Sequence, residues 1–107
     1  MNGHDNDLLF TVQTPLGFSV RCHHTYWVRK IVAQHLVMVD RVEQVKQALR
    51  TPDEVRVSRI DENVYIFYIQ AEKRLVCAVA RTSTDQGFLI TAYPADKMKE
   101  GRTVWKK

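Results

Sequence analysis

The chain has few of the residues from which nucleotide loops are built and no segment suited to crossing a membrane. Its 107 residues include four glycines, three prolines and two cysteines. Neither a glycine-rich phosphate-binding loop nor a nucleophile elbow occurs. No apolar run approaches the roughly 20 residues that a membrane span needs. The polar, acidic start at residues 1–7 also lacks a signal-peptide pattern, so we expect a cytoplasmic protein.

Metal-binding spacings are missing as well. Cys22 and Cys77 are far apart, and each lies in an apolar, strand-like context that favours a reduced core residue over a disulfide. His23 and His24 are adjacent, so their side chains point in different directions, and His4 lies in the polar start. No Cys/His pair fits zinc, and no acidic cluster suits magnesium or calcium. We therefore expect no metal and no other cofactor.

Length and composition indicate one folded unit. Hydrophobic residues make up 45% of the chain, which is normal for a globular protein. We expect a disordered N-terminus at residues 1–7 and a single domain at residues 8–107. The formal net charge of +4 is compatible with a polyanionic partner but does not identify one.

Two helices are expected in the first half of the chain. The first covers residues 25–34, with helical spacing of its apolar side chains. These are Trp27, Val28, Ile31 and Val32. The second runs from Asp40 to about Leu49, where Asp40 is a good N-cap and Glu43 completes a capping-box pattern. A hairpin of residues 8–13 and 18–22 can precede both helices.

The second half of the chain has strand character. Apolar or alternating segments lie near residues 54–60, 63–70, 74–82 and 87–93, separated by short turns. Successive strands joined by short turns pair most simply as an antiparallel meander. The predicted fold class is therefore α+β: N-terminal helices, with or without the preceding hairpin, packed on one face of a four-stranded antiparallel β-meander.

The last of these strands carries polar groups at its end. Alternation places Thr91 and Tyr93 on one face together with Leu89, and Lys97 and Lys99 follow a proline that ends the strand. Hydroxyl and ammonium groups gathered at a sheet end could hold a phosphate. A terminal strand followed by a solvated tail is the alternative interpretation.

His35 follows the first predicted helix and is the candidate proton donor or acceptor. Histidine changes its protonation near neutral pH, which suits acid–base catalysis. It could equally end the helix by bonding a last-turn carbonyl. Arginines on the predicted strands add cations beside aromatic residues, a combination that suits RNA, although exposed arginines also keep a sheet soluble. They are Arg56, Arg59, Arg74 and Arg81.

Taken together, these segments resemble a known group of nucleases. A histidine segment followed by a helix that ends in Thr-Pro-Asp resembles an "H…L…PD.V..S" signature. Its residues here are His35, Leu49, Pro52, Asp53, Val55 and Ser58. The ending Ile90-Thr91-Ala92-Tyr93-Pro94, with a lysine-rich segment closing on Trp105, is the most specific part. Over about residues 18–107 the chain resembles the phage-associated branch of the barnase–EndoU–colicin–RelE nuclease superfamily.

This resemblance implies metal-independent cleavage of RNA, often as a toxin with a cognate antitoxin or immunity protein. It implies that His35 acts as acid or base and that Thr91 and Tyr93 supply polar groups at the sheet end. Arg81, or alternatively Arg56, would bind the scissile phosphate. Independently of the resemblance, the strand arginines and the lysine-rich end are expected to contact RNA; these residues are Arg56, Arg59, Arg74, Lys97 and Lys99. A non-catalytic RNA- or protein-binding module on the same fold remains the alternative.

Overall fold

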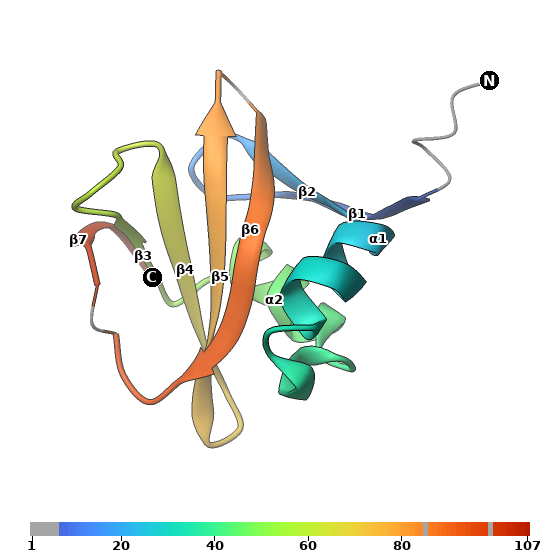
Figure 1. Ribbon diagram of the computed structural model, residues 1–107. Helices are drawn as coiled ribbons and strands as arrows, with labels where there is room; N and C mark the ends of the chain where they lie inside the picture. The colour runs from blue at the N-terminus through green and yellow to red at the C-terminus, as the bar shows by residue number, and fades with distance from the viewer. Residues whose placement is uncertain (1–6, 85, 99) are drawn as a thin grey trace.

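The computed structural model describes residues 7–84, 86–98 and 100–107, which form a mixed β-sheet flanked by short helices (Figure 1). The elements in chain order are β1 (Leu8–Gln13), β2 (Ser19–His23), α1 (His24–Tyr26), the π-helix η2 (Trp27–Val32), the 3-10 helix η3 (Leu36–Met38), α2 (Val42–Arg50), β3 (Glu54–Val57), β4 (Val64–Ala71), β5 (Arg74–Ser83), β6 (Gln86–Ala95) and β7 (Arg102–Lys106). Within these residues the sheet has seven strands in the order β1-β2-β6-β5-β4-β3-β7.

The predicted fold class is wrong. Strands β3 to β6 do pair antiparallel in sequence order, but they are the middle of a larger sheet. The hairpin of β1 and β2 joins that sheet because β2 pairs in parallel with the start of β6, Ser19 opposite Gln86 and Arg21 opposite Phe88. At the other edge β7 pairs antiparallel with β3. The sheet is therefore mixed, and helices do not form an N-terminal layer on a four-stranded meander.

Gly101 explains how β7 reaches β3. Its φ of +87° is a conformation that L side chains rarely adopt, and a Cβ placed there would lie 2.5 Å from the carbonyl oxygen of Val57. Glycine thus lets the chain pass against β3 as it enters β7. The run Thr103-Val104-Trp105 in β7 has strand propensity, and it was overlooked as part of a basic tail.

The first helix is shorter and wider than predicted. α1 continues directly into η2, where the amide of Ala33 bonds the carbonyl of Val28 across five residues. This wider turn directs Trp27 and Ile31 into the core, where they are 3% and 0% exposed, and leaves Val28 45% exposed. The α-helical spacing predicted for Trp27, Val28, Ile31 and Val32 therefore does not place Val28 with the buried residues.

The second helix also begins differently. α2 starts at Val42, and Arg41 occupies the N-cap position. In the described structure the N-cap side chain makes no capping hydrogen bond. The predicted Asp40–Glu43 capping box is therefore wrong, and Glu43 pairs with Lys46 instead at 3.4 Å. Thr51 ends the helix, as the Thr-Pro-Asp sequence indicated.

The main core lies between the sheet and α2, which packs on β1, β4 and β5 (Figure 1). Phe67 and Leu49 are fully buried there. The opposite face carries a smaller cluster, against which Met98 of the β6–β7 connection packs. Its buried members are Ile66, Tyr68, Leu75 and Cys77.

The cysteines agree with the sequence interpretation. Cys22 and Cys77 are free and buried, in the main core and the smaller cluster respectively. Burial raises the pKa of each thiol to about 12. Both therefore remain protonated at neutral pH, as inert core residues do.

Residues 1–6 of the predicted disordered start lie outside the described residues. Asp7, the last residue of that segment, accepts a hydrogen bond from Thr25 Oγ1 at 2.9 Å. None of the helices in the described ranges is long and apolar enough for a membrane span.

Candidate functional site

A β-bulge at Ile90 shapes the region around the predicted site. Opposite β5, Ala80 pairs with Leu89 and Val79 with Thr91, so Ile90 is an extra residue in β6. Before the bulge β6 lies between β2 and β5. Beyond it, in the described structure, no strand pairs with the outer edge of β6, and η2 and η3 contact this part of the molecule instead.

The bulge also changes which side chains share a face. Leu89 and Ala92 both belong to the main core, whereas Tyr93 packs on the smaller cluster of the opposite face. The prediction that Leu89 shares a face with Thr91 and Tyr93 is therefore wrong. A regular alternation cannot anticipate one inserted residue, because each insertion moves every following side chain to the other face.

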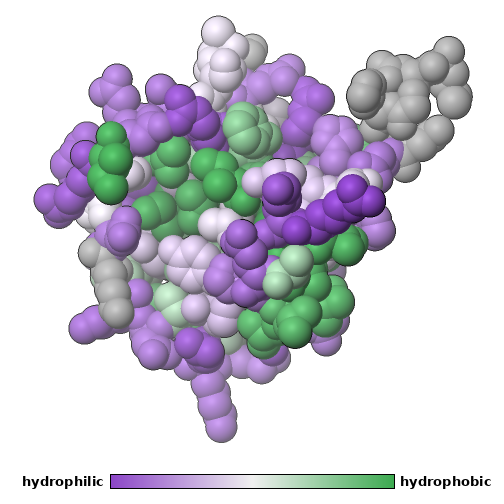
Figure 2. Space-filling view, viewed as in Figure 1, coloured by the Kyte–Doolittle hydropathy of each residue, from purple (hydrophilic) through white to green (hydrophobic). Residues whose placement is uncertain are grey.

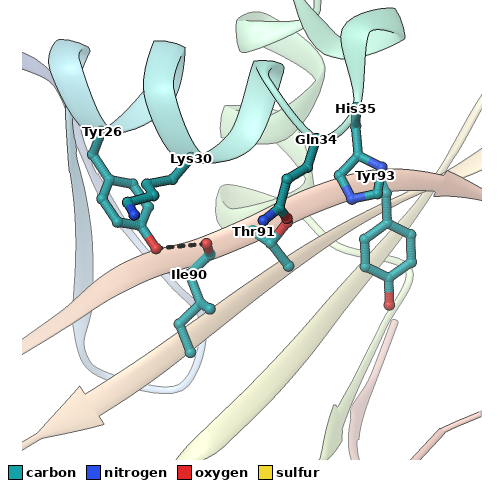
Figure 3. A pocket seen from close by; sticks show the side chains of 7 residues that line it. All are labelled: Tyr26, Lys30, Gln34, His35, Ile90, Thr91 and Tyr93. Carbon is teal, nitrogen blue, oxygen red and sulfur yellow. Dashed lines mark hydrogen bonds between the residues drawn. The ribbon is translucent and has the colours of Figure 1, made fainter.

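The helical segment is attached to β6 at this bulge. The Tyr26 hydroxyl donates a hydrogen bond to the carbonyl oxygen of Ile90 at 2.8 Å (Figure 3). That carbonyl lies on the edge of β6 where the parallel pairing with β2 has ended. The bond therefore satisfies a backbone acceptor and fixes the helix beside the strand.

Between the helix and the strand lies an open cavity of about 440 Å³. Its lining comes from the helical segment and from β6 (Figure 3): Tyr26, Lys30, Gln34, His35, Ile90, Thr91 and Tyr93. His35, Thr91 and Tyr93, which the sequence analysis proposed from two distant segments, thus share one site.

Three lining residues were missed by the sequence analysis. Tyr26, Lys30 and Gln34 are spaced four residues apart, so they form a polar stripe on one side of the helical segment. This spacing is visible in the sequence. Spacing alone does not show that this stripe faces a strand rather than solvent.

His35 lies between η2 and η3. Its backbone amide bonds the carbonyl of Ile31 at 2.9 Å, and its ring lies against the ring of Tyr93 with the centroids 5.6 Å apart. The side chain is partly exposed. The His35 ring is therefore partly accessible to solvent while Tyr93 positions it.

Thr91 and Tyr93 differ in what their hydroxyls can do. Thr91 Oγ1 is buried and has no hydrogen-bond partner in the described part of the chain. The Tyr93 hydroxyl points away from Thr91 and Lys30 (Figure 3). Burial, followed by the nearby Cys77, Tyr68 and Glu100, raises the pKa of Tyr93 to about 12. Tyr93 is thus a protonated phenol at neutral pH, and its ring, rather than its hydroxyl, faces His35.

The two candidate phosphate-binding arginines do not line this cavity. Arg81 forms an ion pair with Asp61, and the pKa of Asp61 is lowered by the Asn63 amide first and by Arg81 second. Arg56 pairs with Glu54 at 2.7 Å and lies over the Tyr68 ring. The described residue that brings a cation to the cavity is Lys30.

None of the other predicted RNA contacts among the described residues lines this cavity. Arg74 pairs with Asp96 at 3.3 Å, and Arg59 is exposed between β3 and β4. Lys97 is exposed in the β6–β7 connection, and Lys99 lies outside the described residues. No group of three or more His, Cys, Asp or Glu side chains that could hold a metal occurs in the described ranges.

The other residues of the signature have roles in the fold. Pro52 and Val55 are fully buried, and the Asp53 carboxylate accepts a hydrogen bond from the amide of Gln70 at 2.8 Å. Ser58 Oγ accepts bonds from the amides of Ile60 and Asp61 in the β3–β4 turn. In this chain these positions support the helix end and the following strand.

No protein-family model matches this chain, and neither does any curated protein or solved structure with which it was compared.

Proposed function

We propose that this protein is a metal-independent endoribonuclease whose active site is the cavity between η2 and β6. The observation that carries the proposal is the lining of one open cavity by His35, Lys30 and Thr91. These supply an imidazole, a cation and a hydroxyl without a partner among the described residues. This set suffices for RNA, because RNA provides its own nucleophile.

In the proposed reaction the substrate's 2′-hydroxyl attacks the adjacent phosphorus. Neutral His35 accepts the hydroxyl proton as the O2′–P bond forms. The P–O5′ bond breaks, the leaving oxygen takes a proton from water, and His35 later returns its proton to solvent. The products are a 2′,3′-cyclic phosphate and a free 5′-hydroxyl.

Lys30 and Thr91 stabilise the charge that develops in this step. The Lys30 ammonium group neutralises the non-bridging phosphate oxygens, and the Thr91 hydroxyl, which is buried in the described structure, donates a hydrogen bond to one of them once its side chain turns toward the cavity. Lys30 takes the role expected of a strand arginine, because Arg81 is bound to Asp61 and lies outside the cavity lining. Tyr93 positions the His35 ring.

The resemblance to the phage-associated nuclease branch supports the same activity. It also supports a role as a toxin that a cognate antitoxin or immunity protein controls. The net charge of +4 is compatible with both an RNA substrate and an acidic inhibitor.

The test is incubation of purified protein with RNA in excess EDTA, followed by end analysis of the fragments. We expect cleavage with 2′,3′-cyclic phosphate ends, and no cleavage of a substrate with 2′-deoxyribose at the scissile position. Binding should weaken steeply as salt rises, because contacts to phosphates release counterions. Cleavage that EDTA abolishes and magnesium restores would contradict the proposal.

A protein-binding module is the second candidate, because three aliphatic side chains are exposed immediately after His35. Leu36, Val37 and Val39 are 74%, 49% and 62% exposed. Figure 2 shows apolar surface at this corner of the molecule, at the lower right. The absence of cleavage, together with RNA binding that is weak or independent of salt, would favour this candidate over the nuclease.

A further inference from the structure

A second cavity lies on the far side of Tyr93. It has a volume of about 350 Å³ and occupies the sheet face covered by the β6–β7 connection. The lining residues are Tyr68, Arg74, Cys77, Tyr93, Pro94, Ala95, Asp96, Lys97 and Glu100. Tyr93 lines both cavities, and its hydroxyl points away from the first (Figure 3). A ligand that crosses Tyr93 can therefore occupy both at once.

The two cavities differ in charge. The described lining of the first contains Lys30 and His35 but no carboxylate, which suits a phosphate. The second contains the carboxylates of Asp96 and Glu100 between the cations Arg74 and Lys97. Carboxylates repel phosphate but accept hydrogen bonds from N–H groups. The second cavity therefore suits a neutral group that carries hydrogen-bond donors.

Glu100 is the carboxylate best placed to accept such a bond. Asp96 already pairs with Arg74 at 3.3 Å, whereas no ion pair within the described ranges involves Glu100. The Glu100 charge lies close enough to Tyr93 to help raise the pKa of that phenol, after burial, Cys77 and Tyr68. Burial also raises the pKa of Tyr68, whereas the Glu100 backbone lowers it through a hydrogen bond.

Tyr93 adds a flat aromatic wall, whereas the Tyr68 ring is buried in the smaller cluster with Arg56 over it and is not open for stacking. Their raised pKa values keep both phenols protonated at neutral pH. Aromatic side chains bind unpaired bases by stacking, and this contact accepts any base. Selection among bases must then come from the polar groups of the cavity.

We propose that the second cavity binds a nucleobase next to the scissile phosphate and prefers a base with an exocyclic amino group, which donates to the Glu100 carboxylate. This inference rests on the proposed nuclease function. Adenine, cytosine and guanine carry such an amino group. Uracil presents carbonyl oxygens at the corresponding positions, and the carboxylate repels them.

The experiment uses DNA oligonucleotides with a single ribonucleotide, so that one bond can be cleaved. The base on each side of that bond is varied in turn among adenine, cytosine, guanine and uracil or thymine. We expect kcat/KM to fall roughly tenfold with uracil or thymine at one of the two positions, the scale of one good base contact. Equal rates for all bases at both positions would overturn the proposal.

Glu100→Gln tests the residue itself, with Glu62→Gln as the matched control. Both glutamates are exposed, and Glu62 lines a different cavity. Glu100→Gln should remove most of the tenfold preference, because it lowers kcat/KM for substrates with an amino-bearing base and removes the repulsion of uracil or thymine. Glu62→Gln should keep the preference. An unchanged preference in folded Glu100→Gln would remove Glu100 from the proposal.

Direct binding separates this inference from the proposed function. All-DNA oligonucleotides cannot be cleaved by 2′-hydroxyl attack, so their affinity can be titrated for each base without turnover. Base-selective binding that Glu100→Gln abolishes would support the subsite even if no cleavage of any RNA were found. Cleavage without base selectivity in either assay would contradict the subsite and leave the nuclease function standing.

Discussion

Polar side chains at two corners of the sheet differ in whether they are bonded to other groups of the protein. At the corner of β3 and β7, Glu54 is only 7% exposed, and its Oε2 accepts hydrogen bonds from Arg56 at 2.7 Å and Thr103 at 2.6 Å. Arg56 also bonds the Met98 carbonyl at 3.4 Å. The charged side chains at this corner are thus bonded to other groups of the protein.

The corner of β6 and η2 is different. Neither Lys30 nor His35 has an ion pair within the described ranges, and Thr91 Oγ1 is buried without a described partner. Leaving a buried polar group unpaired costs about 1–3 kcal/mol. The comparison indicates that the polar groups of the β3–β7 corner stabilise the fold, whereas these three side chains of the β6–η2 corner make no such bonds within the described residues.

Replacing His35 should give the largest effect and confine it to activity. For His35→Ala we expect RNA cleavage to slow by about 10²-fold or more, because proton transfer is lost. The free energy of unfolding should change by less than about 1 kcal/mol, because the side chain is partly exposed. Cleavage rates measure the loss of activity, and chemical denaturation measures the free energy of unfolding. His24→Ala, an exposed histidine outside the cavity lining, should change neither.

Replacing Glu54 should instead lower stability and leave activity unchanged. Glu54→Gln should lower the free energy of unfolding by about 1–3 kcal/mol at pH 7, because a buried hydrogen-bonded charge is lost. Activity per folded molecule should not change. Chemical denaturation and cleavage assays on the same preparation measure both. Glu43→Gln is the control, since Glu43 pairs with Lys46 on the surface, and its effect should stay below about 1 kcal/mol.

The Glu54 effect should also depend on pH. The Thr103 hydrogen bond, followed by Arg56, lowers the pKa of Glu54 in the folded protein. Its contribution is therefore complete above the unfolded pKa of about 4.3 and is lost as pH falls through the lowered folded value. The stability difference between wild type and Glu54→Gln should shrink between pH 7 and pH 3. A difference that grew on acidification would contradict this assignment.

Tyr26 connects the open corner to the rest of the fold. Tyr26→Phe removes the hydrogen bond to the Ile90 carbonyl, and we expect a loss of about 0.5–1.5 kcal/mol in the free energy of unfolding. Denaturant titration measures it. Tyr65→Phe is the control, because no described hydrogen bond involves the Tyr65 hydroxyl. Equal stability of Tyr26→Phe and wild type would mean that this bond does not fix the helix beside β6.

Thr91 gives the smallest effect on stability. Thr91→Val replaces a hydroxyl without a described partner by a methyl group of similar size, so stability should stay the same or rise by up to about 1 kcal/mol. Cleavage should slow by about tenfold, because one donor to the phosphate is lost. Thermal unfolding measures the change in stability, and cleavage rates measure the change in activity. A clear loss of stability would show that the hydroxyl has a structural partner.

Much of the local structure could be predicted from the sequence. The apolar segments at β4 and β5, the end of α2 at Thr51 and the burial of Trp27 follow from periodicity and turn residues, which act over a few positions. The titratable histidine after the first helix and the Thr-Ala-Tyr ending also drew attention to three residues of the cavity.

The arrangement of those segments was decided by tertiary structure. The parallel pairing of β2 with β6 joins residues more than 60 positions apart, and no local pattern encodes it. The extra residue at Ile90 reverses the faces of β6, and the π-turn in η2 changes which side chains are buried. Whether a cation is paired depends on what packs beside it: Asp61 reaches Arg81, while Lys30 faces a cavity. Short-range chemistry thus selects the elements, and long-range packing determines which of their polar groups remain available to a ligand.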